Sequence, residues 1–195
     1  IRDAAGFRNV ASIILEKSNS NMLVVISAIA DITNQLEKVV QFHVNGDDQL
    51  AQDKLEEIKN FHFQLANELL ESNSAQLIDT LSNALVEIEW ILDEPCQDPA
   101  DYLYDQIVSV GELLSTNILA AYLNKEKKVC TWVDARNYIK TDNTYQNANV
   151  DWNLSKELIQ TDLLPILETE LLITQGFIGS TSENFSTTLG REGSD

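Results

Sequence analysis

Cysteine is scarce in this chain, with only two among its 195 residues. Cys96 and Cys130 lie at a helix boundary and in an apolar run, and the sequence has no C-x-x-C spacing. A disulfide framework, which is typical of small secreted proteins, is therefore disfavoured. We predict a reduced, cytoplasmic protein.

Positive charge is also in short supply. The chain has 13 basic against 31 acidic residues, which gives a formal net charge of -18. Such a balance disfavours sequence-independent binding of nucleic acid and binding to an anionic membrane surface. We therefore expect neither as a partner, and an anionic ligand would have to be held by local donors.

Long apolar runs are missing as well. No run approaches the roughly 18 residues needed to cross a bilayer. Residues 1–7 show no basic region followed by an apolar core, so they do not read as a secretory signal. We predict no membrane insertion, and the length fits one domain over residues 1–195, large enough for a sheet covered on both faces.

Glycine is rare overall, with seven residues, but four of them fall in the last twenty positions. These are Gly176, Gly179, Gly190 and Gly193. A glycine can turn the backbone in directions closed to other residues, and exposed amides in such loops can cradle an anion. Beside these amides lie a guanidinium group, a hydroxyl and a carboxylate, from Arg191, Ser194 and Asp195. The alternative is a plain hairpin with turn glycines.

Strands and helices are predicted to alternate along the chain. Apolar runs of strand length occupy residues 22–26, 129–133 and 171–173, as in parallel strands covered on both faces. Helical spacing of apolar residues predicts helices over 2–17, 31–40, 47–92 with a division at Asn73, 99–123, and 152–167 with an interruption at Pro165. Residues 141–151 are polar and rich in Asn, and we predict a loop there.

This order predicts an α/β three-layer sandwich with a mainly parallel central sheet between helical layers. Ligands of such sheets lie beyond the carboxyl ends of the strands. Ser27, Asp134 and Gly176 follow the three predicted strands directly. We therefore expect the functional site at that edge of the sheet.

Three motifs resemble the aspartate kinase domain of the amino acid kinase fold family. They are V-V-I-S-A-I-A-D-I-T-N at residues 24–34, S-V-G-E-L-L-S-T at 109–116, and T-Q-G-F-I-G followed by T-T-L-G-R-E-G-S-D within 174–195. The likeness extends over nearly the whole chain, and the motifs stand in the family's order. The resemblance implies the amino acid kinase fold, incomplete in this chain.

The resemblance also implies roles for individual residues around an aspartate substrate. The implied substrate-binding residues are Thr33, Glu112, Phe177, Arg191, Ser194 and Asp195. Arg191 suits a substrate carboxylate because its guanidinium donates two parallel hydrogen bonds. Glu112 is the candidate acceptor for the substrate's ammonium group, and Phe177 would form a pocket wall. Asp195 would orient the cationic groups that hold the transferred phosphoryl, and Ser27 is the weakest candidate.

The implied reaction transfers the γ-phosphoryl of ATP, with Mg²⁺, to the side-chain carboxylate of L-aspartate. The product, 4-phospho-L-aspartate, would begin lysine, threonine and methionine biosynthesis. Catalysis of this kind relies on positioning and electrostatics rather than on covalent chemistry by the protein. The resemblance further implies a homo-oligomer in the complete protein.

The sequence departs from the family pattern at both ends. The family's K-F-G-G-T-S strand would precede residue 1, and its nucleotide-binding half would follow residue 195. We therefore expect the 195-residue chain alone to be inactive. Two alternatives stay open: a related amino acid kinase with another substrate, and a non-catalytic amino-acid-binding or assembly module.

Several of these residues also have ordinary structural interpretations. Without the motif, Glu112 would be a solvated helix charge. Thr33 could cap a helix, and Arg191 could pair with a neighbouring carboxylate at the surface. We interpret His43 and His62 as partly buried residues without a metal. The three tryptophans, Trp90, Trp132 and Trp152, are expected in the core or at an interface.

Overall fold

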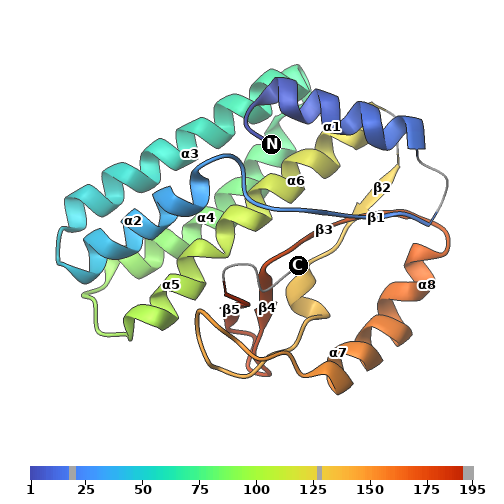
Figure 1. Cartoon of the computed structure of the whole chain (residues 1–195). Helices are drawn as coiled ribbons and strands as arrows, with labels where there is room; N and C mark the ends of the chain where they lie inside the picture. Colours follow the sequence, from blue (N-terminus) through green and yellow to red (C-terminus); the bar gives the residue numbers. More distant parts are fainter. Residues whose placement is uncertain (18–20, 127–128, 191–195) are drawn as a thin grey trace.

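The computed structural model describes residues 1–17, 21–126 and 129–190, and Figure 1 shows the course of the chain. The α-helices are α1 (Ala4–Lys17), α2 (Ile32–Val44), α3 (Asp48–Leu70), α4 (Ala75–Asp93), α5 (Ala100–Val108), α6 (Val110–Lys125), α7 (Trp152–Leu158) and α8 (Leu164–Leu167). Short 3-10 turns are η1 (Glu71–Asn73) and η2 (Ala135–Asn137), and the π-helical segment η3 (Ile159–Leu163) joins α7 to α8. The strands are β1 (Leu23–Ile26), β2 (Cys130–Trp132), β3 (Leu171–Gln175), β4 (Ile178–Ser180) and β5 (Ser186–Thr188).

The centre of the fold is a parallel sheet in the order β1-β3-β2. Leu23 pairs with Leu172 on one side of β3, and Cys130 pairs with Leu171 on the other. Every residue of β3 is buried, as expected for a central parallel strand. All three predicted parallel strands are therefore confirmed.

Helix α6 is the core helix of the larger helical layer, and residues 107–116 are buried without interruption. The stretch Ala100–Lys125 is long and apolar enough to span a membrane, which our sequence analysis did not anticipate. Of its most apolar window, 78% is buried inside the protein, which is the position of a core helix. Helices α1 to α5 add their apolar faces to the same hydrophobic core.

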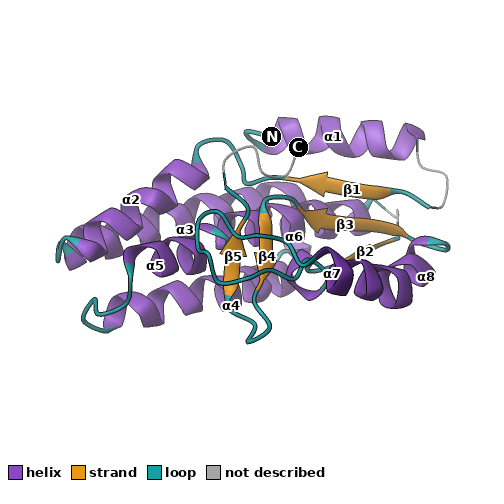
Figure 2. Cartoon of the chain, turned by 60° about the horizontal axis from the view of Figure 1, so that its bottom comes forward, coloured by secondary structure: helices purple, strands orange, loops and turns teal. Residues whose placement is uncertain are grey.

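The second face of the sheet is covered only in part. Val133 and Leu172 pack there against Leu163 from the segment that links α7 and α8. On the neighbouring strand β1, Leu23 is 40% and Val25 is 54% exposed. The sheet thus lies between helices, as predicted for an α/β sandwich, but the prediction that β1 is covered on both faces is wrong. Figure 2 shows β4 and β5 as a separate hairpin beyond the arrowhead of β3.

Two of the predicted helices are interrupted at positions that the sequence analysis did not predict. Residues 99–123 form two helices, because the chain tightens at Ser109, whose carbonyl accepts from the Glu112 amide three residues on. In the last helical stretch the irregularity is the π segment before Pro165. Proline donates no amide hydrogen and its ring crowds the preceding turn, so the helix widens upstream of it.

Buried and exposed positions also differ from expectation at histidine and tryptophan. His43 and His62 are fully buried. Burial lowers the pKa of His62 to about 4, while a hydrogen bond from its Nδ1 atom to the Ile58 carbonyl opposes this shift. Trp90 and Trp152 are 65% and 75% exposed, so neither belongs to the core, and an interface role stays a prediction. The amphipathic pattern of a helix does not show which residues at the edge of its apolar face are covered by a neighbouring helix or strand.

Candidate functional site

The sequence-predicted site residues divide into those that the structure describes and those outside it. Arg191, Gly193, Ser194 and Asp195 lie outside the described residues. Ser27, Thr33, Glu112, Gly176, Phe177, Gly179 and Gly190 are described.

Glu112 lies in the first turn of α6 and is only 3% exposed. Burial raises the pKa of its carboxyl to about 8, while a hydrogen bond with the backbone of Ala28 opposes the rise. Among the described residues nothing hydrogen-bonds its Oε2 atom. A buried acid without a full set of partners is costly to folding, so it marks a candidate functional group. The ordinary interpretation of Glu112 as a solvated charge is wrong.

The segment after β1 lies directly against this end of α6. A Cβ atom built on Gly111 would be 3.2 Å from Ala28 Cβ and 3.4 Å from a methyl carbon of Ile32. The close approach brings the loop after β1 and the start of α2 beside Glu112. Thr33 is the second residue of α2 and is half-buried, while Asp31 occupies the N-cap position. Thr33 therefore does not cap the helix, and Ser27 is exposed at the exit of β1.

Phe177 follows β3 with a φ of 67°, a left-handed conformation that is strained for a bulky side chain. Its carbonyl accepts from the Leu189 amide at 2.9 Å, which ties the end of β3 to the end of β5. Backbone strain of this kind is retained at positions that the surrounding structure fixes, and these cluster at functional sites. A cavity of about 560 Å³ opens here, and Phe177 and Gly190 both line it.

A buried polar network joins the strand exits to the helix that carries Glu112. Gln175 donates through Nε2 to Thr116 Oγ1 at 2.8 Å and accepts from the Ala135 amide at 2.7 Å. Trp132 Nε1 also donates to Thr116 Oγ1, and Thr116 in turn donates to the Glu112 carbonyl. Gln175 and Thr116 lie within the motifs at residues 174–195 and 109–116, but neither was assigned a site role from the sequence.

Asp134 lies just beyond β2, as predicted, and its carboxylate forms an ion pair within the chain. Arg136 donates to both carboxylate oxygens of Asp134 and, through Nη1, to Ser186 Oγ at 3.0 Å. Asp134 also caps η2 through the Arg136 amide. This ion pair therefore fastens the exit of β2 to the β4–β5 hairpin.

Of the three described loop glycines, Gly179 and Gly190 are needed for close approach of neighbouring segments. Gly176 precedes Phe177 and is half-buried at the exit of β3. Gly190 has a φ of 81°, and a Cβ there would lie 2.6 Å from Asn147 Oδ1. A Cβ on Gly179 would lie 2.7 Å from the Ile139 carbonyl oxygen. β4 and β5 do form a hairpin, but its turn at residues 181–185 contains no glycine, so the interpretation of a plain hairpin with turn glycines is wrong. Gly179 and Gly190 instead pack against residues 139–147.

Gly179→Ala should lower the free energy of unfolding by about 1 to 3 kcal/mol, because the new methyl group would collide with backbone that cannot swing aside. Urea denaturation of the protein would measure the change. Gly6→Ala is the matched control, since its nearest contact is the end of the Ile1 side chain and alanine favours helix α1. Equal stability of the two variants would contradict the close-approach argument.

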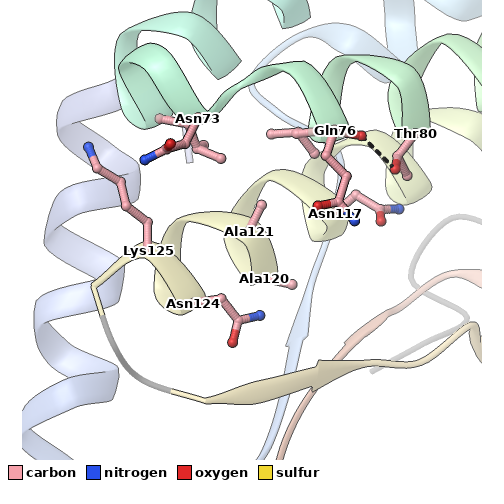
Figure 3. A pocket seen from close by; sticks show the side chains of 10 residues that line it. Asn73, Gln76, Thr80, Asn117, Ala120, Ala121, Asn124 and Lys125 are labelled. Carbon is pink, nitrogen blue, oxygen red and sulfur yellow. Dashed lines mark hydrogen bonds between the residues drawn. The ribbon is translucent and has the colours of Figure 1, made fainter.

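A second cavity, of about 420 Å³, lies away from the strand exits, between the end of α3, α4 and α6 (Figure 3). Asn73, Gln76 and Asn117 point toward it in the figure. Lys125 already donates to the Leu69 carbonyl, and Asn124 pairs with the backbone of Cys130. None of the sequence-predicted site residues lines it, so we assign it no role.

Comparison with known proteins gives one consistent family. The model described as the amino acid kinase family matches residues 1–195. Lysine-sensitive aspartokinase 3 of Escherichia coli is 33% identical over 195 residues, which cover all of this chain and 42% of that protein. Bifunctional aspartokinase/homoserine dehydrogenase 2 of the same organism is 28% identical over 197 residues, covering 100% and 24%. The chain thus spans less than half the length of these relatives.

Solved structures agree with the sequence comparison. E. coli aspartokinase III in complex with aspartate and ADP superposes with a TM-score of 0.83 at 30% identity, covering 98% of this chain and 42% of that one. The same enzyme in complex with lysine and aspartate gives a TM-score of 0.86 at 32% identity and the same coverage. The similarity therefore includes the parallel sheet and the helices around it.

Proposed function

We infer that this chain, which belongs to the amino acid kinase family, is the aspartate-binding part of an ATP-dependent aspartate kinase. The observation that carries the proposal is the buried carboxyl of Glu112, whose Oε2 atom has no hydrogen-bond partner among the described residues. A bound ammonium group would supply both the charge and the hydrogen bonds that this carboxylate lacks. The E. coli relative crystallised with aspartate and ADP supports the choice of substrate.

In the proposed reaction, the substrate's ammonium group binds Glu112 and its backbone lies against Phe177. Arg191 binds a substrate carboxylate in a bidentate manner, and Thr33, Ser194 and the loop amides complete the contacts. Asp195 orients the cationic groups that hold the transferred phosphoryl. The γ-phosphoryl of ATP then passes to the side-chain carboxylate and gives 4-phospho-L-aspartate, the first intermediate toward lysine, threonine and methionine.

We propose that ATP binds together with Mg²⁺, and we assign no described residue to either of them. Within the described ranges, no group of three or more His, Cys, Asp or Glu side chains is arranged to hold a metal ion. We further propose that the complete kinase is a cytoplasmic homo-oligomer.

The test uses the complete kinase, meaning a protein that carries this chain together with the rest of the kinase domain. Incubation with ATP, Mg²⁺ and L-aspartate should give an acyl phosphate, which hydroxylamine traps as a hydroxamate. N-acetyl-L-aspartate, which has no ammonium group, should be turned over at least tenfold less efficiently, since it cannot satisfy Glu112. The 195-residue chain alone should give no product.

The same assay separates the two alternatives. Turnover of another carboxylic amino acid in preference to aspartate would indicate a related amino acid kinase. Binding of aspartate without phosphoryl transfer in the complete protein would indicate a non-catalytic module. Equal turnover of N-acetyl-L-aspartate and aspartate would contradict the assignment of Glu112.

A further inference from the structure

Asp105 is a fully buried carboxylate that belongs to none of the three motifs. It lies in α5 and is 0% exposed. In the described part of the chain its hydrogen-bond partners are two backbone amides and one hydroxyl. Thr188 donates from its amide to Oδ2 at 2.9 Å and from Oγ1 to Oδ1 at 2.6 Å. The Gln146 amide lies 3.0 Å from Oδ2 and 3.2 Å from Oδ1.

These contacts make one side chain the meeting point of three segments. They are α5, the loop over residues 141–151, and β5, which are far apart in the sequence. Gln106 strengthens the same junction, because its side-chain amide donates to the Ser186 carbonyl and accepts from the Ser186 amide. Helix α5 therefore holds β5 through side chains on two consecutive residues.

The junction lies immediately behind one wall of the cavity that Phe177 and Gly190 line, which we take as part of the proposed aspartate pocket. Leu189, the next residue after Thr188, donates its amide to the carbonyl of the strained Phe177. On the loop side, Gln146 has a φ of 66°, and Asn147 packs against Gly190. Gln146, Asn147, Phe177 and Gly190 all line the cavity of about 560 Å³. The two segments that Asp105 joins thus form one wall of that cavity.

A carboxylate suits this junction better than an amide would. All the contacting groups donate, and an ionised carboxylate only accepts, so every hydrogen bond is matched. Burial raises the pKa of Asp105, whereas the hydrogen bonds from Thr188 and Gln146 lower it. Asparagine has the same shape but would turn an NH₂ group toward one of the amide donors. A buried charge is costly to place, which argues against a purely packing role.

We propose that Asp105 is a positioning residue for aspartate binding: by holding Thr188 and Gln146 together, it sets the place of Phe177 and Gly190 in the substrate pocket. This inference rests on the proposed function, because it assigns aspartate as the ligand of that pocket. The side chain itself touches no substrate. Its effect is transmitted through the backbone of residues 188–190.

The experiment compares Asp105→Asn and Thr188→Val with wild type in the complete kinase. Thr188→Val removes only the hydroxyl donor and keeps the side-chain shape, so it tests the junction with less risk to folding. Asp101→Asn is the matched control, since Asp101 is exposed one turn earlier on the same helix. Steady-state kinetics would give the KM for each substrate, and hydrogen exchange would report the protection of the Thr188 and Gln146 amides.

We expect Asp105→Asn to raise the KM for aspartate about tenfold or more, as for loss of hydrogen bonds to a charged group, with the KM for ATP within about twofold. Thr188→Val should show a smaller change of the same kind, and Asp101→Asn none. In Asp105→Asn the Thr188 and Gln146 amides should exchange faster.

Three outcomes would overturn the inference. They are an unchanged KM for aspartate despite faster exchange, an equal loss for aspartate and ATP, and unchanged amide protection in Asp105→Asn. A wild-type protein that does not turn over aspartate would instead overturn the proposed function, and the substrate role of Asp105 with it. The exchange measurement would still show in that case whether Asp105 holds the two segments.

Discussion

Aspartate should bind the complete kinase more weakly as the pH falls, approaching a factor of about ten for each pH unit below 8. Burial raises the pKa of Glu112 to about 8 in the ligand-free protein. Below that pH the carboxyl is protonated and cannot accept the charge of the substrate's ammonium group. Binding therefore requires loss of the proton, and the apparent affinity follows the ionised fraction.

Isothermal titration calorimetry at pH 6, 7 and 8 would measure the affinity. Repeating the titration at pH 7 in two buffers of different ionisation enthalpy counts protons, and we expect close to one released per aspartate bound. Glu112→Gln should bind aspartate weakly and without this pH dependence. An affinity that is constant from pH 6 to 8 in wild type would show that Glu112 does not receive the ammonium group.

The ligand-free protein offers an independent control on the same carboxyl. Its folded-state pKa is raised above the ordinary value of 4.5, so the protonated side chain favours the folded state. That contribution is fully present below pH 4.5 and is lost as the pH rises through about 8. The shift corresponds to on the order of 5 kcal/mol. Glu112→Gln should therefore be the more stable protein in urea at pH 9, without ligand.

Arg191→Lys should weaken aspartate recognition by roughly ten- to hundredfold in the complete kinase. Arg191 lies outside the described residues, and the argument rests on its chemistry and on its place between Gly190 and Gly193. Lysine keeps the charge but loses the planar fork that donates two parallel hydrogen bonds to a carboxylate. The cost of about 1.5 to 3 kcal/mol is that of a charge-assisted hydrogen bond.

Kinetics on both substrates would test the assignment, with ATP recognition expected to change little. Arg8→Lys is the control, because Arg8 forms an exposed ion pair with Glu68 that joins α1 to α3. Exposed ion pairs contribute little to the free energy of folding, so Arg8→Lys should have the same kinetics as wild type. An unchanged aspartate dependence in Arg191→Lys, or an equal loss for ATP, would mean that Arg191 is structural.

The strands and the aspartate kinase resemblance could be predicted because both depend on local order in the sequence. Apolar runs of strand length located β1, β2 and β3, and the motif around Glu112 indicated a site residue where helix composition alone indicated a surface charge. The matching family model and the E. coli relatives confirm the resemblance. The roles of the individual site residues stay predictions.

Other features could not be predicted because they depend on contacts between distant segments. Asp105 reads as one more acid on an acidic helix until β5 and the 141–151 loop are placed around it. Trp90 has a large apolar side chain of the kind usually found in a core, yet it is exposed at the surface. Pro165 indicated an interruption of the last helix, but it did not show that a π-helical segment would precede it.

The location of Glu112 on α6 bears on how much ordering the site requires when a ligand arrives. Side chains on mobile loops lose rotamer and backbone freedom on binding, and that loss subtracts from affinity. Here the acid projects from α6, which is buried along residues 110–116, and the backbone carbonyl of Glu112 accepts from Thr116. Folding has already fixed its conformation, so the recognition of the ammonium group is preorganised and the entropy penalty of binding falls mainly on the ligand.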